Sequence, residues 1–227
     1  LKGARLFAQW TNKPHRSTRD LDLLGFGDSS SESLRQAVET ICLAEVEPDG
    51  LRFDETTISI EAIRTEQEYG GKRGKLSAYL GDARIPIQID VGFGDAITPE
   101  AEWLEYRTLL DALPVPRVRA YPRETVVAEK LHAMVALGTL NTRMKDFYDV
   151  WALANEFDCT GDMLCQAIRA TFERRATIIT VELPIALEIS FGEDVERKRL
   201  WKGFVTRTTI QGVDDDFPVV LAKVREF

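Results

Sequence analysis

The chain reads Ile-Pro-Ile-Gln-Ile-Asp-Val at residues 85–91, a run in which every second side chain is aliphatic. Successive side chains of a β-strand point to opposite faces of a sheet, so the isoleucines and Val91 would share one buried face. Asp90, between two aliphatic residues, would point to the other face. The run therefore predicts a sheet with one apolar and one polar side, and it places an acid on the polar side.

The patterns around this strand predict two domains. Before it we expect three further strands, at residues 21–24, 57–60 and 75–80. We also expect two helices there, at residues 2–10 and 33–44. After Pro114 and Pro116 the pattern becomes helical, at residues 124–137, 145–156, 162–174 and 216–227. The sequence thus predicts an α/β (α+β) fold, with an α/β domain over residues 1–116 and a helical domain over residues 117–227.

The composition is that of a globular protein, with 44% hydrophobic and 29% charged residues. There is no apolar run of about 18 residues, so we expect no membrane span. The three cysteines have neither disulfide nor zinc spacing, which favours buried thiols in a reducing cytoplasm. A net charge of −8 indicates a protein that does not bind nucleic acid through its overall charge, which leaves open only a local basic groove.

A pair of acids forms the sharpest local motif, in the run Arg19-Asp20-Leu21-Asp22-Leu23. Acids two residues apart on a strand share a face, where their oxygens can hold the hard divalent cation Mg²⁺. Asp90 would supply a third carboxylate. Such a site suits phosphoryl or nucleotidyl transfer. The plainer interpretation is a turn cap at Asp20 and a solvated Asp22, and the small-residue turn before the acids, together with Asp90, favours the metal site.

A second group of charged residues lies in the helical half. A lysine on a helix, such as Lys130, offers a point charge to a triphosphate. Asp146 could hold that lysine in place, and Lys145 could contact phosphate or the acceptor. The alternative is a pair of amphipathic helices with surface ion pairs, which contribute little to stability. Composition alone favours neither interpretation.

Four runs that contain these residues resemble one known family. They are Leu-Lys-Gly-Ala at residues 1–4, Arg-Ser-Thr-Arg-Asp-Leu-Asp at 16–22, Tyr-Pro-Arg-Glu-Thr-Val-Val-Ala-Glu-Lys-Leu-His-Ala at 121–133, and Arg-Met-Lys-Asp-Phe-Tyr-Asp at 143–149. Together they resemble the AbiEii/AbiGii toxin family of nucleotidyltransferases, the toxic partners of type IV toxin–antitoxin and abortive phage-infection systems. The resemblance covers most of the chain in order.

The resemblance implies a fold, an activity and partners. It implies a polymerase-β-like nucleotidyltransferase domain with a mixed sheet, followed by a helical C-terminal domain. It also implies a nucleoside triphosphate substrate, Mg²⁺ as cofactor and, for some members, transfer of nucleotides to the acceptor end of tRNA. The antitoxin implied by the resemblance is a separate winged-helix protein. No membrane partner is expected.

The resemblance also assigns roles to individual residues. Asp20 and Asp22 match the metal carboxylates, Lys130 matches the triphosphate lysine, and Asp146 matches an acid that acts as base or positioner. The remaining expectations are a third metal ligand at Asp90 and nucleotide contacts from Gly3, Ala4, Arg19 and Lys145.

One departure from the family pattern motivates an alternative. The family turn reads Gly-Gly or Gly-Ser and then Thr, whereas this chain reads Gly3-Ala4-Arg5 and so lacks the hydroxyl. The main hypothesis is an Mg²⁺-dependent nucleotidyltransferase toxin that acts on an RNA hydroxyl, with the 3′ end of tRNA as the leading candidate and a protein hydroxyl as the other. The alternatives are a nucleotide-binding or partner-binding module of the same fold that has lost catalysis, and a phosphodiesterase that uses the same acids.

Overall fold

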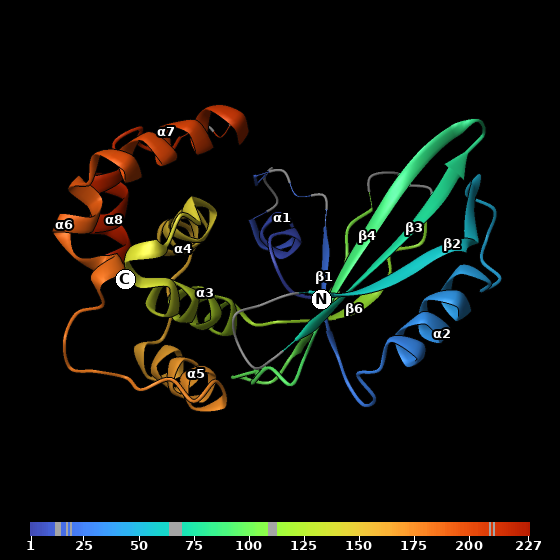
Figure 1. Cartoon of the computed structure of the whole chain (residues 1–227), viewed down its shortest axis with the longest axis horizontal. Helices are drawn as coiled ribbons and strands as arrows, with labels where there is room; N and C mark the ends of the chain where they lie inside the picture. The colour runs from blue at the N-terminus through green and yellow to red at the C-terminus, as the bar shows by residue number, and fades with distance from the viewer. Residues whose placement is uncertain are drawn as a thin grey trace. The chain divides into compact units, whose positions relative to one another are not determined.

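The structure is a computed structural model of the whole chain, and it describes residues 1–11, 15–16, 18, 20–63, 70–108, 113–208, 210 and 212–227 (Figure 1). Contacts between residues divide the chain into two compact units. We call the first, Leu1–Gly3 with Thr18–Asp95, the sheet unit. The second, Ala4–Ser17 with Ala96–Phe227, is the helical unit.

The sheet unit contains a four-stranded mixed sheet in the order β1-β4-β3-β2. The edge strand β1 (Leu21–Gly25) runs parallel to β4 (Ala83–Phe93). The strands β3 (Gly71–Leu80) and β2 (Leu51–Ile63) continue the sheet in antiparallel pairs. The predicted strands at residues 21–24, 57–60, 75–80 and 85–91 all lie within these four. The predicted mixed sheet is therefore confirmed.

The helix α2 (Ser31–Cys42) covers one face of this sheet. It begins after Ser30, whose hydroxyl accepts the backbone N–H of Ser33 in the usual way of a helix N-cap. Val38 of α2 packs against Ile58 and Leu76 in a buried apolar cluster, which partly buried isoleucines of β4 extend. As predicted, Ile87 and Ile89 of the alternating β4 run face this core, whereas Ile85 near the start of the strand is exposed.

The other face of the sheet is polar, and we call it the polar face. Residues that pair across neighbouring strands point to the same side, so the register places its members in rows. One row is Asp22, Asp90, Arg73 and Glu61, and the next contains Gln88, Lys75 and Ser59. The alternation that builds the core on one side thus gathers charged and hydroxyl side chains on the other.

The helical unit contains a short two-stranded sheet and a set of helices. Its elements are α1 (Arg5–Thr11), β5 (Glu102–Glu105), β6 (Arg117–Ala120), α3 (Arg123–Leu137), η1 (Gly138–Leu140), α4 (Met144–Glu156), α5 (Gly161–Arg174), η2 (Ile185–Leu187), α6 (Ile189–Glu193), α7 (Val195–Thr208) and α8 (Phe217–Glu226). Aromatic rings from α4, α6, α7 and α8 form its core: Phe147, Phe191, Trp201 and Phe217. No helix in the described part of the chain is long and apolar enough to cross a membrane.

The boundary between the two compact units differs from the domain boundary predicted at residue 116. The sheet unit ends at Asp95, and the β5–β6 pair and α1 belong to the helical unit. The reason for the placement of α1 is aromatic packing. Phe7 of α1 stacks on His15 with ring centroids 4.1 Å apart, and His15 stacks on Tyr148 of α4 at 4.9 Å. Leu6 and Phe7 are both fully buried.

Candidate active site

The structure brings two of the predicted acids to neighbouring positions on the polar face. Asp22 of β1 and Asp90 of β4 are register partners on parallel strands, so their side chains point to the same side. Asp20 precedes β1 by one residue, and its Oδ1 accepts a hydrogen bond from Nε2 of Gln88 over 2.9 Å. The three carboxylates therefore belong to one end of the polar face.

Asp90 is engaged by an arginine that the sequence pattern did not single out. Arg73 of β3 donates from Nε and Nη2 to the two carboxylate oxygens of Asp90, over 2.8 and 2.7 Å. This bidentate hydrogen bond, followed by the charges of Asp90, Asp20 and Glu61, raises the pKa of Arg73 above its ordinary value. Only the register could have revealed this partner, because Arg73 lies directly opposite Asp90 in the β3–β4 pair.

The turn before α1 is closely fitted to Asp22. Gly3 has a φ of +79°, and a Cβ at this position would lie 2.2 Å from Oδ2 of Asp22. The backbone of the turn is also anchored to β1, because Lys2 N–H donates to the Asp22 carbonyl over 2.9 Å. Lys2 Nζ in turn bonds Asp95 Oδ2 over 2.6 Å. Only glycine combines this backbone conformation with this approach to the carboxylate.

The oxygen donors at this end of the sheet suit the chemistry of Mg²⁺, which takes carboxylate and water oxygens. Asp20 and Asp22 are the donors that would hold it, with Asp90 beside them in its pair with Arg73. Within the described ranges, no group of three or more His, Cys, Asp and Glu side chains is arranged to bind a metal ion.

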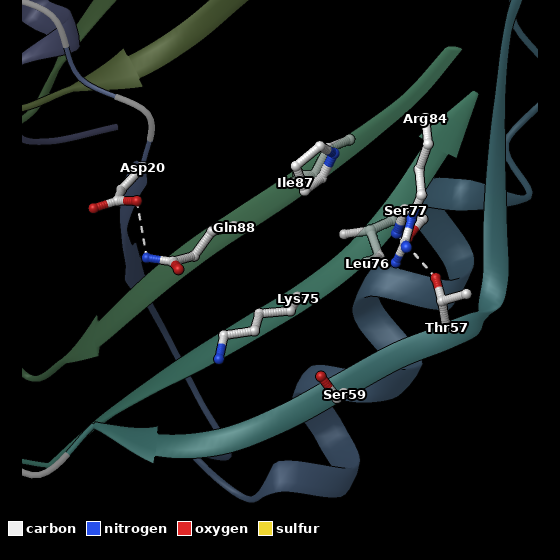
Figure 2. A pocket seen from close by; sticks show the side chains of 10 residues that line it. Asp20, Thr57, Ser59, Lys75, Leu76, Ser77, Arg84, Ile87 and Gln88 are labelled. Carbon is white, nitrogen blue, oxygen red and sulfur yellow. Dashed lines mark hydrogen bonds between the residues drawn. The ribbon is translucent and has the colours of Figure 1, made fainter. Parts of the chain in front are cut away.

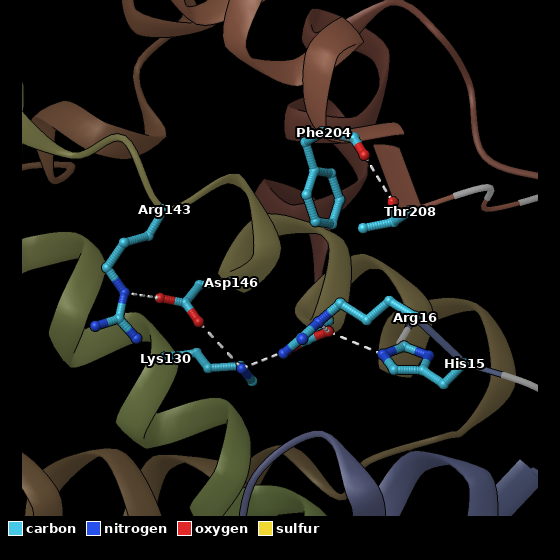
Figure 3. Close-up of polar contacts among 8 residues, drawn as sticks. His15, Arg16, Lys130, Arg143, Asp146, Phe204 and Thr208 are labelled. Carbon is cyan, nitrogen blue, oxygen red and sulfur yellow. Dashed lines mark hydrogen bonds and ion pairs between the residues drawn. The ribbon is translucent and has the colours of Figure 1, made fainter. Parts of the chain in front are cut away.

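A second charged cluster, which we call the buried ion network, lies inside the helical unit (Figure 3). Its centre is Asp149 of α4, whose side chain is 0% exposed. Asp149 Oδ2 accepts from Lys130 Nζ over 2.6 Å, and Arg16 binds both carboxylate oxygens over 2.8 Å. His15 Nε2 lies 2.8 Å from Asp149 Oδ1. Segments that are distant in sequence thus meet at one buried carboxylate.

The predicted residues Lys130 and Asp146 belong to this network. Lys130 Nζ donates to Asp146 Oδ1 over 3.1 Å, and Arg143 Nε donates to Asp146 Oδ2 over 2.6 Å. No role was predicted from the sequence for Asp149, His15 or Arg16. For Asp149 a signal was present, because Asp146 and Asp149 are three residues apart and therefore share one side of α4.

The charges of the network fix its protonation. Burial by itself raises the pKa of a carboxyl, but Lys130 and Arg16 hold the pKa of Asp149 far below its ordinary value. The pKa of Asp146 is lowered against burial by Lys130 and Arg143. Burial also acts to lower the pKa of Lys130, yet Asp149 and Asp146 outweigh it and raise that pKa. All three groups are therefore charged, and Asp146 is a weak base suited to positioning Lys130.

Lys145 adds positive charge beside this network. Its pKa is lowered, first by desolvation and then by the neighbouring cations Arg143, Arg16 and Lys130, while Asp146 acts in the opposite sense. The cations around the network outnumber its two carboxylates, and such an excess favours an anion. Ala4, which directly precedes α1, is buried, and its side chain is apolar. Arg19 lies outside the described residues.

Comparison with known proteins places the chain in a family. Two solved structures share the fold over 98% of this chain. One is JHP933 from Helicobacter pylori, which is 15% identical, with a TM-score of 0.54 and 79% of its own chain covered. The other is an H. pylori protein provisionally described as a nucleotidyltransferase, which is 16% identical, with a TM-score of 0.51 and 82% of its own chain covered. No curated protein sequence matches. The model of the nucleotidyl transferase AbiEii toxin of type IV toxin–antitoxin systems matches residues 1–223. The chain therefore belongs to the AbiEii nucleotidyltransferase toxin family.

Proposed function

We propose that this protein is an Mg²⁺-dependent nucleotidyltransferase that moves a nucleotide from a nucleoside triphosphate to the 3′-terminal hydroxyl of tRNA. The observation that carries the proposal is the register pairing of Asp22 with Asp90, beside Asp20 and against the Gly3 turn. Two neighbouring acids and a third that is distant in sequence share one end of a polar sheet face. Family membership supplies the reaction class and a separate antitoxin partner.

The reaction assigns a task to each of these groups. The acceptor oxygen attacks the α-phosphorus of the triphosphate and forms a new P–O bond. The bond from the α-phosphorus to the oxygen that bridges to the β-phosphate breaks, and pyrophosphate leaves. The hydroxyl proton passes to solvent or to a carboxylate. Asp20 and Asp22 would hold the cation, which supplies charge neutralisation for the phosphates. Asp90 lies beside them, and its bidentate pair with Arg73 offsets its negative charge.

The helical unit contributes positive charge in this proposal. Lys130 has three N–H donors and uses two of them on Asp146 and Asp149. We assign its remaining donor, together with Lys145, to the oxygens of a phosphate group. Asp146 then acts as a positioning residue that fixes the ammonium of Lys130.

Transfer of radioactive nucleotide to total tRNA, with Mg²⁺ and each of the four triphosphates in turn, tests this function. Asp22→Asn should abolish labelling, because it removes the charge that holds the cation. Asp49→Asn is the matched control, since Asp49 is an exposed turn residue whose carboxylate accepts the backbone N–H of Leu51. Labelling that persists in Asp22→Asn would contradict the assigned role.

Calorimetry with nucleoside triphosphates separates the alternatives. Nucleotide binding with no labelling of any RNA by the parent protein would favour a binding module that has lost catalysis, as the Gly3-Ala4-Arg5 turn suggests. Release of free nucleotides from RNA with no triphosphate present would instead indicate a phosphodiesterase.

A further inference from the structure

The polar face has a second end that the proposed reaction does not use. In the register, Arg52 of β2 pairs with Tyr79 of β3, and Tyr79 pairs with Arg84 of β4. We call these three residues the arginine–tyrosine row. Tyr79 lies six residues from Arg73 on β3, and Arg84 lies six residues from Asp90 on β4. Residues an even number of positions apart on a strand point to the same side, so this row and the acids share one face. The guanidinium carbon of Arg52 lies 4.7 Å from the centroid of the Tyr79 ring.

A pocket of about 400 Å³ connects the two ends of the polar face (Figure 2). Asp20 and Gln88 line the end near the carboxylates, and Arg84 lines the end near the arginine–tyrosine row. Between them lie Lys75 and the hydroxyl groups of Thr57, Ser59 and Ser77. This volume is within the range of small-molecule sites, about 300–1,000 Å³, and its lining offers both donors and acceptors to a sugar.

An irregularity in β2 shapes this pocket. The register of β2 against β3 shifts between Asp54 and Ser59. Within that shift, the Ser77 N–H donates to the side-chain Oγ1 of Thr57 over 2.9 Å. A β-bulge of this kind redirects side chains and is common beside binding sites.

Charge is separated along the polar face. The acids gather at one end, whereas Arg52 and Arg84 lie at the other. Arg84 Nε donates to the neutral hydroxyl of Ser77 over 3.0 Å, and within the described parts of the chain no carboxylate lies close enough to pair with it. Asp54 belongs to the same region, but its Oδ1 accepts from the hydroxyl and the N–H of Thr56. In a chain of net charge −8, this local positive end is the exception.

We propose that the polar face is the track for the single-stranded 3′ end of the RNA acceptor. A base stacks on Tyr79, the backbone phosphates pair with Arg52 and Arg84, and the terminal nucleotide occupies the pocket with its hydroxyl directed to the carboxylates. Aromatic platforms flanked by arginine are the usual means of holding single strands without reading their sequence. Six residues of strand separate Arg84 from Asp90, or about 20 Å, which accommodates a few nucleotides. This proposal takes one point from the proposed function, namely that the acceptor is RNA.

Fluorescence anisotropy with a labelled 12-nucleotide single-stranded RNA tests the track on the full-length chain. Tyr79→Ala should weaken binding between about 5-fold and 100-fold, because it removes one base-stacking surface. Tyr79→Phe keeps the ring and should bind like the parent. Equal affinity of the Ala and Phe variants would overturn the stacking role.

Salt titrations test the phosphate contacts. Arg84→Gln keeps a donor for Ser77 but removes the charge, and it should lower the slope of log affinity against log salt by about one. Arg35→Gln, on α2 at the opposite face, is the matched control and should leave the slope unchanged. A 12-base-pair RNA duplex should bind more weakly than the single strand. Tighter binding of the duplex, or an unchanged slope for Arg84→Gln, would overturn the proposal.

The labelling assay separates this proposal from the proposed function. If the parent labels RNA and the Tyr79 and Arg84 variants bind and label it equally well, the track is wrong and the function stands. If the parent labels no RNA but these variants lose affinity for the single strand, the track stands and the proposed reaction is wrong.

Discussion

Gly3 and Asp22 are packed so closely that a Cβ added at Gly3 would lie 2.2 Å from Oδ2 of Asp22. No real Cβ contact is that short, so an alanine at this position must displace the carboxylate or the turn. The glycine also has a φ of +79°, which disfavours any other residue. Gly3 and Asp22 therefore constrain one another, and the position of a proposed metal ligand depends on a glycine of the preceding turn.

Gly3→Ala should reduce nucleotide transfer about 100-fold, as expected when a reacting group is misplaced by about 1 Å. Gly27→Ala is a closely matched control, because Gly27 has a φ of +84° but an added Cβ there would meet nothing within 4 Å. Initial rates of labelling measure the effect, and circular dichroism verifies that both variants fold. Equal rates for the two variants would show that the approach to Asp22 has no role in the reaction.

Arg73 should control the Mg²⁺ requirement, because it neutralises Asp90 through a bidentate pair. Arg73→Gln removes the cation that pairs with Asp90 and so makes the site around Asp20 and Asp22 more negative by one charge. The Mg²⁺ concentration for half-maximal labelling should then fall, about 3- to 10-fold for a nearby charge that is partly screened. Arg73→Lys keeps the charge and should stay near the parent value. An identical requirement in both variants would mean that Asp90 has no influence on the cation.

The periodic parts of the fold were predictable from sequence, and the reasons are local. The alternation of residues 85–91 fixed both the strand and the side on which Asp90 lies. The helix α7 was not predicted, because its buried Trp201 and Phe204 are surrounded by charged residues and give no clear apolar stripe. The strands β5 and β6 were missed because each has only four residues.

Of the candidate site, only the pairs of residues that are close together in the sequence were predictable. Asp20 and Asp22 were found because acids two residues apart share a face of a strand. The partners of Asp149 were not found, because His15 and Arg16 reach it from the other end of the chain. Likewise, nothing in the sequence around Arg73 indicates which strand it will pair with. Tertiary pairing therefore decides which cation each carboxylate contacts.

Loss of Asp149 should destabilise the helical unit strongly. Asp149→Asn leaves Lys130 and Arg16 buried beside a neutral amide, and breaking a buried ion pair in this way costs about 3–5 kcal/mol of the free energy of unfolding. Arg143→Gln removes a half-exposed arginine from Asp146 and should cost about 1 kcal/mol or less. Urea denaturation at pH 7 measures both. Similar midpoints for the two variants would contradict a central role for Asp149.

The same carboxylate should govern acid unfolding. The folded state lowers the pKa of Asp149 below the ordinary 3.8, so its contribution to stability is present above pH 3.8 and is lost as the pH falls below that value. The midpoint of urea denaturation of the parent should therefore decline steeply below about pH 4. In Asp149→Asn, already less stable at pH 7, this decline should be shallower. A parallel decline in both proteins would show that other groups dominate acid unfolding.

His132 should make the protein sensitive to milder acid. It is buried in α3, with Nε2 2.8 Å from the Thr177 hydroxyl and Nδ1 3.3 Å from Nη1 of Arg175. Since arginine can only donate, Nδ1 must accept, and the proton belongs on Nε2. Protonation would place a second buried charge beside Arg175. Burial first, and then Arg175, lowers the pKa of His132 from 6.5 to about 4.

The sign of the pH effect follows from this lowered pKa. Below pH 6.5 the unfolded chain takes up a proton at His132 that the folded chain refuses until about pH 4, so acid favours unfolding over this window. The parent should lose about 2 kcal/mol of unfolding free energy between pH 7 and pH 5 from this group. His132→Gln should lose none of it, although it is less stable at pH 7. Urea denaturation of both proteins at the two pH values decides the matter, and an equal loss in both would mean that His132 titrates normally in the folded state.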